Sequence, residues 1–190
     1  EPGFFLKFQN FQTKLSKYFS LNLNQVFHDD KLYSVGSLID QAVAKRLESE
    51  RPIGVFLSGG IDSSLIAESM VRQSQDSVLS FSIGFEDKSI DESSRASEVS
   101  KAIQTNHMHH VIPNNLTASE ITGILEHLDE PFGDSSYIAM YILSKFASEN
   151  IVVALSGDGG DEIFGGYRRY LANSTLQKNA CVYSILYPVQ

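Results

Sequence analysis

Apolar residues along this chain follow two spacings, one typical of helices and one typical of buried strands. Between residues 32 and 50 they recur every three or four positions, which predicts a helix. Beyond residue 50, short apolar runs alternate with helical stretches. The predicted strands cover about 52–57, 78–83, 107–112 and 151–155, and the predicted helices about 61–74, 92–104, 117–128 and 136–149. This alternation predicts the α/β class, with a parallel sheet flanked by helices on both faces.

The first 30 residues do not share this alternation. Two short strands are predicted there, at about 3–8 and 15–19. We interpret residues 1–30 as a linker or the tail of a preceding domain, and residues 31–190 as the α/β domain. The apolar stretch 183–190 stops abruptly, so we expect this domain to be truncated at its C-terminus.

A glycine turn stands between the first strand of the α/β region and the next helix. It reads Ser58-Gly59-Gly60-Ile61-Asp62-Ser63-Ser64. In open α/β sheets, ligands bind at this end of a strand, and glycines let backbone N–H groups approach an anion closely. The helix N-terminus that follows adds further donors. Asp62 would repel phosphate oxygens unless a cation stood between them, so the turn predicts Mg²⁺ together with a nucleotide polyphosphate.

A second glycine turn follows the strand predicted at 151–155 in the same way. It reads Ser156-Gly157-Asp158-Gly159-Gly160-Asp161-Glu162. Because parallel strands end at one edge of a sheet, we expect the two turns to face one ligand. Asp62 and Asp161 are therefore candidates to share one or more metal ions.

Neither turn fits the other common glycine motifs. No Gly-Lys-Ser/Thr closes the first turn, and the dinucleotide fingerprint fails at both. The second turn lacks the closing Glu of an EF-hand calcium loop. The surroundings of Ser58 are not Gly-x-Ser-x-Gly, which argues against a hydrolase nucleophile.

Composition narrows the class of protein further. The formal net charge of −8 disfavours a protein that mainly grips nucleic acid. Cys181 is the only cysteine, which excludes an intrachain disulfide and a cysteine zinc site, and we interpret it as an inert packed thiol. No apolar run approaches the roughly 20 residues that span a bilayer. The N-terminal stretch does not resemble a secretory signal, so a cytoplasmic location is expected.

Four motifs, in this order, resemble the synthetase domain of glutamine-dependent asparagine synthetases, within the PP-loop ATP pyrophosphatases. Two are the glycine turns, and the others are Ser80-Phe81-Ser82-Ile83-Gly84-Phe85 and Asp129-Glu130-Pro131-Phe132-Gly133-Asp134. The resemblance covers about residues 32–172 and implies the adenine nucleotide alpha hydrolase-like fold. It also implies a ligase reaction. ATP adenylates the side-chain carboxylate of aspartate with release of pyrophosphate, and ammonia then gives asparagine and AMP.

The resemblance implies roles for individual residues. The residues implied to hold pyrophosphate are Ser58, Gly59, Gly60, Asp62 and Ser63. The residues implied to contact the rest of ATP are Leu57, Ile83, Ser156 and Gly157, with Ile83 beside the adenine. Asp62 and Asp161 match the Mg²⁺ ligands of the family. Asp158 is the implied catalytic residue, because it stands where some relatives carry a Glu tied to forming the acyl-adenylate.

The implied partners are small molecules and one further domain. They are aspartate, ATP and ammonia from glutamine, with a glutaminase domain in the longer protein and a possible homodimer, but no nucleic acid or membrane. Residues 1–20 resemble the last strands of that glutaminase half, whose N-terminal Cys is absent, since residue 1 is Glu. Lysines that the family places near the acyl-adenylate would fall beyond Gln190.

Three alternatives remain at this point. One is a PP-loop enzyme that adenylates another carboxylate, such as a β-lactam synthetase or an amidotransferase of polysaccharide modification. Another is an ATP-binding module without catalysis, against which the intact Asp62, Asp161 and serine-glycine turns argue. The third, RNA thiolation, is disfavoured by the acidic charge and the single cysteine.

Two polar clusters lie outside these motifs. His107, His109 and His110 are interpreted as ordinary strand histidines, with His107 and His109 on one face and His110 opposite. The charged stretch after the predicted strand 78–83 is interpreted as a solvated helix start; its members are Asp87, Asp91, Glu92 and Arg95. The helix at 136–149 is expected to be capped by Ser135 or Ser136.

Overall fold

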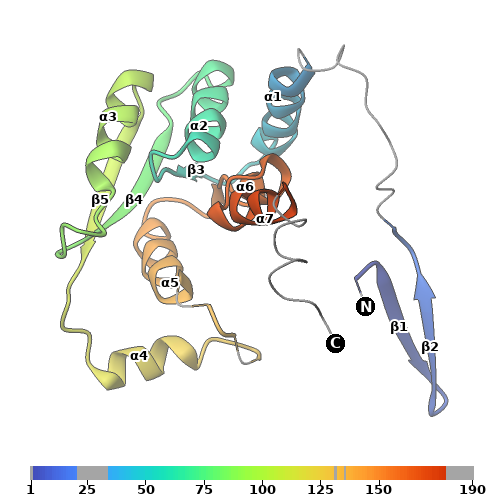
Figure 1. The fold of residues 1–190 in the computed structure, drawn as a ribbon. Helices are drawn as coiled ribbons and strands as arrows, with labels where there is room; N and C mark the ends of the chain where they lie inside the picture. The colour runs from blue at the N-terminus through green and yellow to red at the C-terminus, as the bar shows by residue number, and fades with distance from the viewer. Residues whose placement is uncertain (1, 21–33, 131, 135, 179–190) are drawn as a thin grey trace. The chain divides into compact units, whose positions relative to one another are not determined.

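The chain divides into two compact units, Glu1–Val35 and Gly36–Gln190. The first contains a hairpin and the second a parallel sheet with helices (Figure 1). The computed structural model describes residues 2–20, 34–130, 132–134 and 136–178.

The hairpin of the first unit pairs β1 (Phe4–Gln9) with β2 (Gln12–Lys17) in antiparallel register. Its two-residue turn has Asn10 and Phe11 at φ 51° and 58°, the left-handed values of a type I′ turn. The second strand begins earlier than predicted, because this turn carries no glycine to mark it. Several apolar side chains of the hairpin are exposed, with Phe11 at 96%. A two-stranded hairpin is marginally stable by itself, so these side chains offer a surface for packing.

Four parallel strands form the sheet of the second unit, in the order β5-β4-β3-β6. Their bounds are β3 (Ile53–Phe56), β4 (Leu79–Phe85), β5 (Asn106–Ile112) and β6 (Val153–Leu155). The chain adds β4 and β5 on one side of β3 and then places β6 on the other side. The strand order therefore reverses between β3 and β6, which is where open α/β sheets bind ligands. The two glycine turns follow these strands: residues 58–64, the first glycine loop, follow β3, and residues 156–162, the second glycine loop, follow β6.

Helices cover both faces of this sheet, so the predicted fold class is confirmed (Figure 1). On one face, α1 (Ser34–Leu47), α2 (Ile61–Gln73) and α3 (Ser93–Ile103) enclose a core that includes Val43, Val55, Leu57, Ala67, Met70 and Ala96. On the other face, α5 (Ser136–Ala147) packs over Phe81 and Ile151. No helix in the described parts of the chain is long and apolar enough to cross a membrane.

The remaining helices differ in how well the sequence signals them. α4 (Ala118–Leu125) was predicted and begins with a capping box, in which Thr117 and Glu120 bond each other's backbone N–H groups. α6 (Gly160–Phe164) and α7 (Arg168–Lys178) were not predicted. α6 is five residues long and flanked by glycines, which read as loop.

The cap of α5 differs from the prediction. Asp134 accepts the Ser136 N–H through Oδ1 at 2.9 Å, which lowers the pKa of Asp134. The capping group is thus a carboxylate two residues ahead of the helix, and Ser136 is its donor. Ser135 lies outside the described residues.

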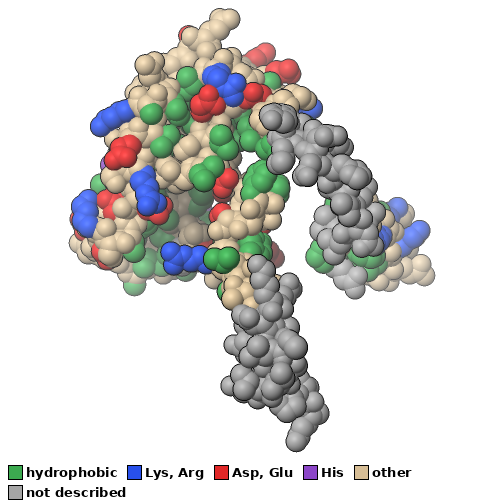
Figure 2. Space-filling view, turned by 45° about the horizontal axis from the view of Figure 1, so that its top comes forward, with side chains coloured by type: hydrophobic (Ala, Val, Ile, Leu, Met, Phe, Trp, Pro, Cys, Tyr) green, Lys and Arg blue, Asp and Glu red, His purple; other side chains and the backbone are tan. Residues whose placement is uncertain are grey.

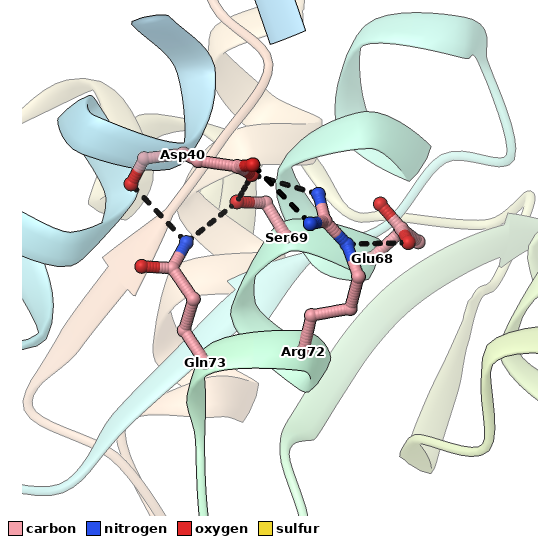
Figure 3. Close-up of polar contacts among 5 residues, drawn as sticks. All are labelled: Asp40, Glu68, Ser69, Arg72 and Gln73. Carbon is pink, nitrogen blue, oxygen red and sulfur yellow. Dashed lines mark hydrogen bonds and ion pairs between the residues drawn. The ribbon is translucent and has the colours of Figure 1, made fainter. Parts of the chain in front are cut away.

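Asp40 fastens α1 to α2 (Figure 3). Its Oδ1 accepts the Ser69 hydroxyl at 2.6 Å and Arg72 Nη2 at 2.7 Å, and its carbonyl accepts Gln73 Nε2 at 3.1 Å. Arg72 Nε also pairs with Glu68 at 2.6 Å. Ser69 is fully buried, and Asp40 is its hydrogen-bond acceptor. The Ser69 and Arg72 hydrogen bonds hold the pKa of Asp40 below its ordinary value.

We expect Asp40→Ala to lower the unfolding temperature by several degrees, because the buried Ser69 hydroxyl loses its acceptor. Glu68→Gln is the matched control. It removes only the exposed pair of Arg72 within α2, and such pairs contribute little. Thermal unfolding followed by circular dichroism measures both. Equal unfolding temperatures for the two variants would show that the Asp40 network does not hold α1 in place.

Candidate nucleotide and metal site

The first glycine loop joins β3 to α2 and is braced by its own serine hydroxyls. Ser63 Oγ accepts the Ser58 N–H at 3.3 Å and lies 3.0 Å from Ser58 Oγ. The Gly60 N–H donates to Ser58 Oγ at 3.2 Å, and the Ser64 hydroxyl donates to the Gly60 carbonyl at 2.6 Å. Ser63 is only 7% exposed. These hydroxyls set the shape of the loop from within.

Gly59 brings this loop into direct contact with α3. Its φ of 80° is left-handed, which favours glycine. A Cβ at Gly59 would lie 2.7 Å from both the Arg95 carbonyl carbon and the Ala96 nitrogen. The position therefore requires glycine for its conformation and for space.

The second glycine loop packs directly on the first. A Cβ at Gly157 would lie 2.6 Å from the backbone nitrogen of Ser63. A Cβ at Gly160 would lie 2.7 Å from Asp62 Oδ2. The prediction that the two loops meet at one edge of the sheet is confirmed, and the Asp62 carboxyl group lies against the start of α6.

Acidic groups concentrate where the loops meet. The Ser156 hydroxyl donates to Asp158 Oδ2 at 2.8 Å. Asp161 directly follows Gly160, and a Cβ at Gly166 would lie 2.8 Å from Asp161 Cγ. Among the described residues, no three His, Cys, Asp or Glu side chains gather as a metal cluster. The aspartates supply hard oxygen ligands of the kind Mg²⁺ takes, and Mg²⁺ usually completes its shell with phosphates and water.

A tyrosine cluster holds the segment after α6 and was not foreseen from the sequence. The Tyr167 hydroxyl donates to Glu162 Oε1 at 2.6 Å, which raises the pKa of Tyr167 to about 12. The Arg169 guanidinium lies over the Tyr167 ring, 4.3 Å from its centroid, and 5.6 Å from that of Tyr170. Glu162 and Arg169 are thus engaged with aromatic side chains.

A cavity of about 550 Å³ opens beside Asp62. Residues 154–160 line one side of it. Its other walls are mostly apolar and come from α1, α2 and α6; they include Ile39, Val43, Leu65, Ile66, Ile163 and Phe164. Figure 2 shows hydrophobic side chains at the surface among acidic and basic ones. The cavity thus combines a polar end at the loops with apolar walls.

Leu57 directly follows β3, and Ile83 lies near the carboxyl end of the neighbouring strand β4. The Leu57 side chain is 1% exposed and packs in the core, so a ligand at this point would meet its backbone. Ile83 is half-buried and packs on the α5 face of the sheet. The two residues thus serve opposite faces of the sheet.

Asp91 contradicts the interpretation of residues 87–95 as a solvated helix start. Its side chain is 7% exposed. It accepts Lys88 Nζ at 3.0 Å, the Ser93 N–H at 3.1 Å and the Phe85 N–H at 3.4 Å. These bonds, led by that of Lys88, hold the pKa of Asp91 well below its ordinary range. Asp91 therefore anchors the start of α3 to the end of β4, while Asp87, Glu92 and Arg95 are exposed.

The histidines of β5 form a hydrogen-bonded ladder with β4. His107 Nδ1 lies 2.8 Å from Ser80 Oγ, and His107 Nε2 lies 3.1 Å from Ser82 Oγ. His109 Nδ1 lies 3.2 Å from the same Ser82 Oγ. His110 stacks with Phe146 on the opposite face, as predicted. Burial, together with the charge of His109, lowers the pKa of His107.

Comparison with known proteins finds a family model and curated relatives that match most of this chain. The family model for asparagine synthase matches residues 34–186. The glutamine-hydrolysing asparagine synthetase 1 of Bacillus subtilis is 38% identical over 155 residues, covering 80% of this chain and 24% of that protein. The corresponding enzyme of Cricetulus griseus is 35% identical over 161 residues, covering 77% of this chain and 28% of that protein. The chain thus spans about a quarter of the length of these relatives.

A solved structure of an NH3-dependent NAD synthetase from Campylobacter jejuni, in complex with the nitrate ion, is 15% identical. It aligns with a TM-score of 0.47 over 71% of this chain and 60% of that one.

We expect Gly160→Ala to destabilise the protein by about 1–3 kcal/mol, because the new methyl group would press on the Asp62 carboxyl group. Gly123→Ala is the control, since nothing lies within 4 Å of its Cβ and alanine favours the helix there. Urea denaturation of both variants measures the difference. A Gly160→Ala variant as stable as Gly123→Ala would contradict the close contact of the two loops.

The His107 ladder predicts a loss of stability in mild acid. The pKa of His107 is lower in the folded chain than the 6.5 of the free side chain. Between these two values the unfolded chain binds a proton that the folded chain does not, so stability falls as the pH drops below about 6.5. His107→Asn should show a shallower fall. Urea denaturation from pH 7.5 to 5 measures this, and parallel curves for the two proteins would refute the role of His107.

Proposed function

The chain belongs to the asparagine synthase family, and from that premise we propose that it is the nucleotide-binding part of an ATP-dependent amide-forming ligase. In the proposed reaction, a side-chain carboxylate oxygen of aspartate attacks the α-phosphorus of ATP, and pyrophosphate leaves. The nitrogen of ammonia then attacks the acyl carbon. The bond between that carbon and the phosphate oxygen breaks, and AMP leaves with the electron pair of that bond. The longer protein would complete this reaction, since the chain spans about a quarter of its relatives.

One observation carries the proposal. The two glycine loops, at the switch point between β3 and β6, touch through Gly157 against Ser63 and Gly160 against Asp62. An anion site built from glycines is ordinary, but a carboxylate held inside it requires a cation when the anion is a phosphate. That combination supports nucleotide bound together with Mg²⁺.

The first loop would hold the pyrophosphate portion of ATP. Ser58, Gly59, Gly60 and Ser63 surround the start of α2, whose unpaired N–H groups favour an anion. The Ser58 and Ser63 hydroxyls already hold the loop in shape, so little reorganisation is needed when charge develops on the leaving pyrophosphate.

Asp62 and Asp161 would supply carboxylate ligands to Mg²⁺ bound with the nucleotide. When bound, Mg²⁺ neutralises the charge that develops on the leaving phosphate oxygens. The backbone at Gly160 lies close against the Asp62 carboxyl group, and the backbone at Gly166 lies close against that of Asp161. The protein thereby restricts the positions of both carboxylates.

The second loop would serve the nucleoside and the acyl group. Ser156 and Gly157 would contact ATP, and Ile83 would lie beside the adenine, with Leu57 contributing its backbone. Asp158 would act where the acyl-adenylate forms. Its carboxylate accepts a hydrogen bond from the Ser156 hydroxyl, and this bond orients the Asp158 side chain just beyond the carboxyl end of β6.

The longer protein would supply ammonia from a glutaminase domain. The relatives are named as glutamine-hydrolysing enzymes, and the hairpin of residues 4–17 exposes apolar side chains that suit packing against such a domain. We assign residues 1–30 to its tail and residues 31–190 to the synthetase part. A cytoplasmic location and a homodimer complete the proposal.

A second candidate is a PP-loop enzyme that adenylates a less polar carboxylate than aspartate. The apolar walls of the cavity beside Asp62 favour it. Pyrophosphate release by the longer protein, measured with aspartate and with larger apolar carboxylic acids, separates the two. Release that depends on aspartate supports asparagine formation.

We expect Asp62→Asn and Asp161→Asn each to weaken Mg²⁺-dependent ATP binding about tenfold or more, because each removes an anionic oxygen ligand. Asp76→Asn is the matched control, since Asp76 is exposed beyond the far end of α2. Calorimetric titration with ATP, with and without Mg²⁺, measures the affinities. Variants at Asp62 and Asp161 that bind ATP with Mg²⁺ as tightly as Asp76→Asn does would contradict the assignment of these aspartates as metal ligands.

A further inference from the structure

We propose that Arg95 is a further phosphate-binding residue of this site, contacting the polyphosphate held on the first glycine loop. The inference rests on the proposed nucleotide binding and adds a residue from α3, an element outside both glycine motifs. Arg95 would give the first loop a positively charged neighbour, since neither glycine loop contains a Lys or Arg.

The contact between Gly59 and α3 places Arg95 at the loop. A Cβ at Gly59 would lie 2.7 Å from the Arg95 Cβ and from its carbonyl carbon. The base of the Arg95 side chain is therefore in contact with the turn that would surround the phosphates. From there, a guanidinium on three methylene groups can reach an anion bound on the same turn.

Asp91 fixes this position. It is buried and bonds the Phe85 N–H at the end of β4 and the Ser93 N–H at the start of α3. Arg95 lies two residues after Ser93, in the first turn of α3. The anchored helix start thus presents Arg95 from a fixed backbone, and the side chain alone needs to move.

Three other basic side chains among the described residues already have partners. Lys88 pairs with Asp91 at 3.0 Å, Arg46 donates to the Ala42 carbonyl at 2.8 Å, and Arg169 lies over Tyr167. Within the described part of the chain, Arg95 pairs with Glu92 at 3.9 Å, and its side chain is 72% exposed. Such an exposed pair is weak, so a phosphate can displace Glu92.

The negative charge of the site makes a contact between Arg95 and phosphate favourable. The two loops contribute Asp62, Asp158, Asp161 and Glu162, and the chain carries a net charge of −8. Mg²⁺ offsets part of the repulsion between these carboxylates and a polyphosphate. A planar guanidinium offsets more of it and bonds two phosphate oxygens at once.

The test compares Arg95→Ala, Arg95→Lys and the control Lys101→Ala in the full chain. Lys101 is an exposed cation in the last turn of the same helix. Calorimetry with Mg²⁺-ATP, with Mg²⁺-pyrophosphate and with adenosine gives the affinities. Thermal unfolding checks the fold of each variant.

We expect Arg95→Ala to weaken ATP and pyrophosphate binding about tenfold or more, the usual loss for one charged hydrogen-bond partner. Adenosine affinity should not change, Arg95→Lys should recover part of the loss, and Lys101→Ala should match the parent chain. An equal loss for adenosine and pyrophosphate would reveal a structural role and overturn the inference. So would unchanged pyrophosphate affinity in a parent chain that binds ATP. A parent chain that binds neither phosphate ligand would overturn the proposed function itself.

Discussion

The site depends on the close approach of two glycine loops from neighbouring strands. Gly157 leaves room for the backbone of Ser63, and Gly160 leaves room for the carboxyl group of Asp62. A side chain at either position would push the loops apart. The sheet makes this approach available, because β3 and β6 are parallel neighbours on which the strand order reverses. The backbone thus brings an anion site and a carboxylate together.

That arrangement creates an electrostatic conflict that accounts for the other features of the site. Carboxylates next to a phosphate are repulsive, so the site needs cations. Asp62 and Asp161 would take up Mg²⁺, and Arg95, presented by the helix start that Asp91 anchors, would add a second positive charge. The serine hydroxyls of the first loop hold its shape without bringing more charge. The surrounding structure thereby limits how the charged groups can move.

Much of this could be predicted from the sequence. The alternation of apolar runs with helical spacing predicted the parallel sheet, and the placement of Ser58–Ser63 and Ser156–Asp161 after two of its strands predicted that the loops would meet. Three features show why the rest could not be predicted. Asp91 is buried by contacts with Phe85 and Ser93 that depend on tertiary structure, α6 is too short and glycine-flanked to show a period, and the turn at Asn10 and Phe11 has no glycine.

The most direct test of a shared site is nuclear magnetic resonance of the ¹⁵N-labelled chain with ATP and Mn²⁺, a paramagnetic ion that takes the same oxygen ligands as Mg²⁺. The account predicts that the amide signals of both loops, from Ser58 to Ser63 and from Ser156 to Asp161, broaden together at low Mn²⁺ in the presence of ATP. Signals of α4, which belongs to neither loop, should stay sharp. Broadening confined to one loop, or none at either, would contradict a single nucleotide and metal site formed by the two loops.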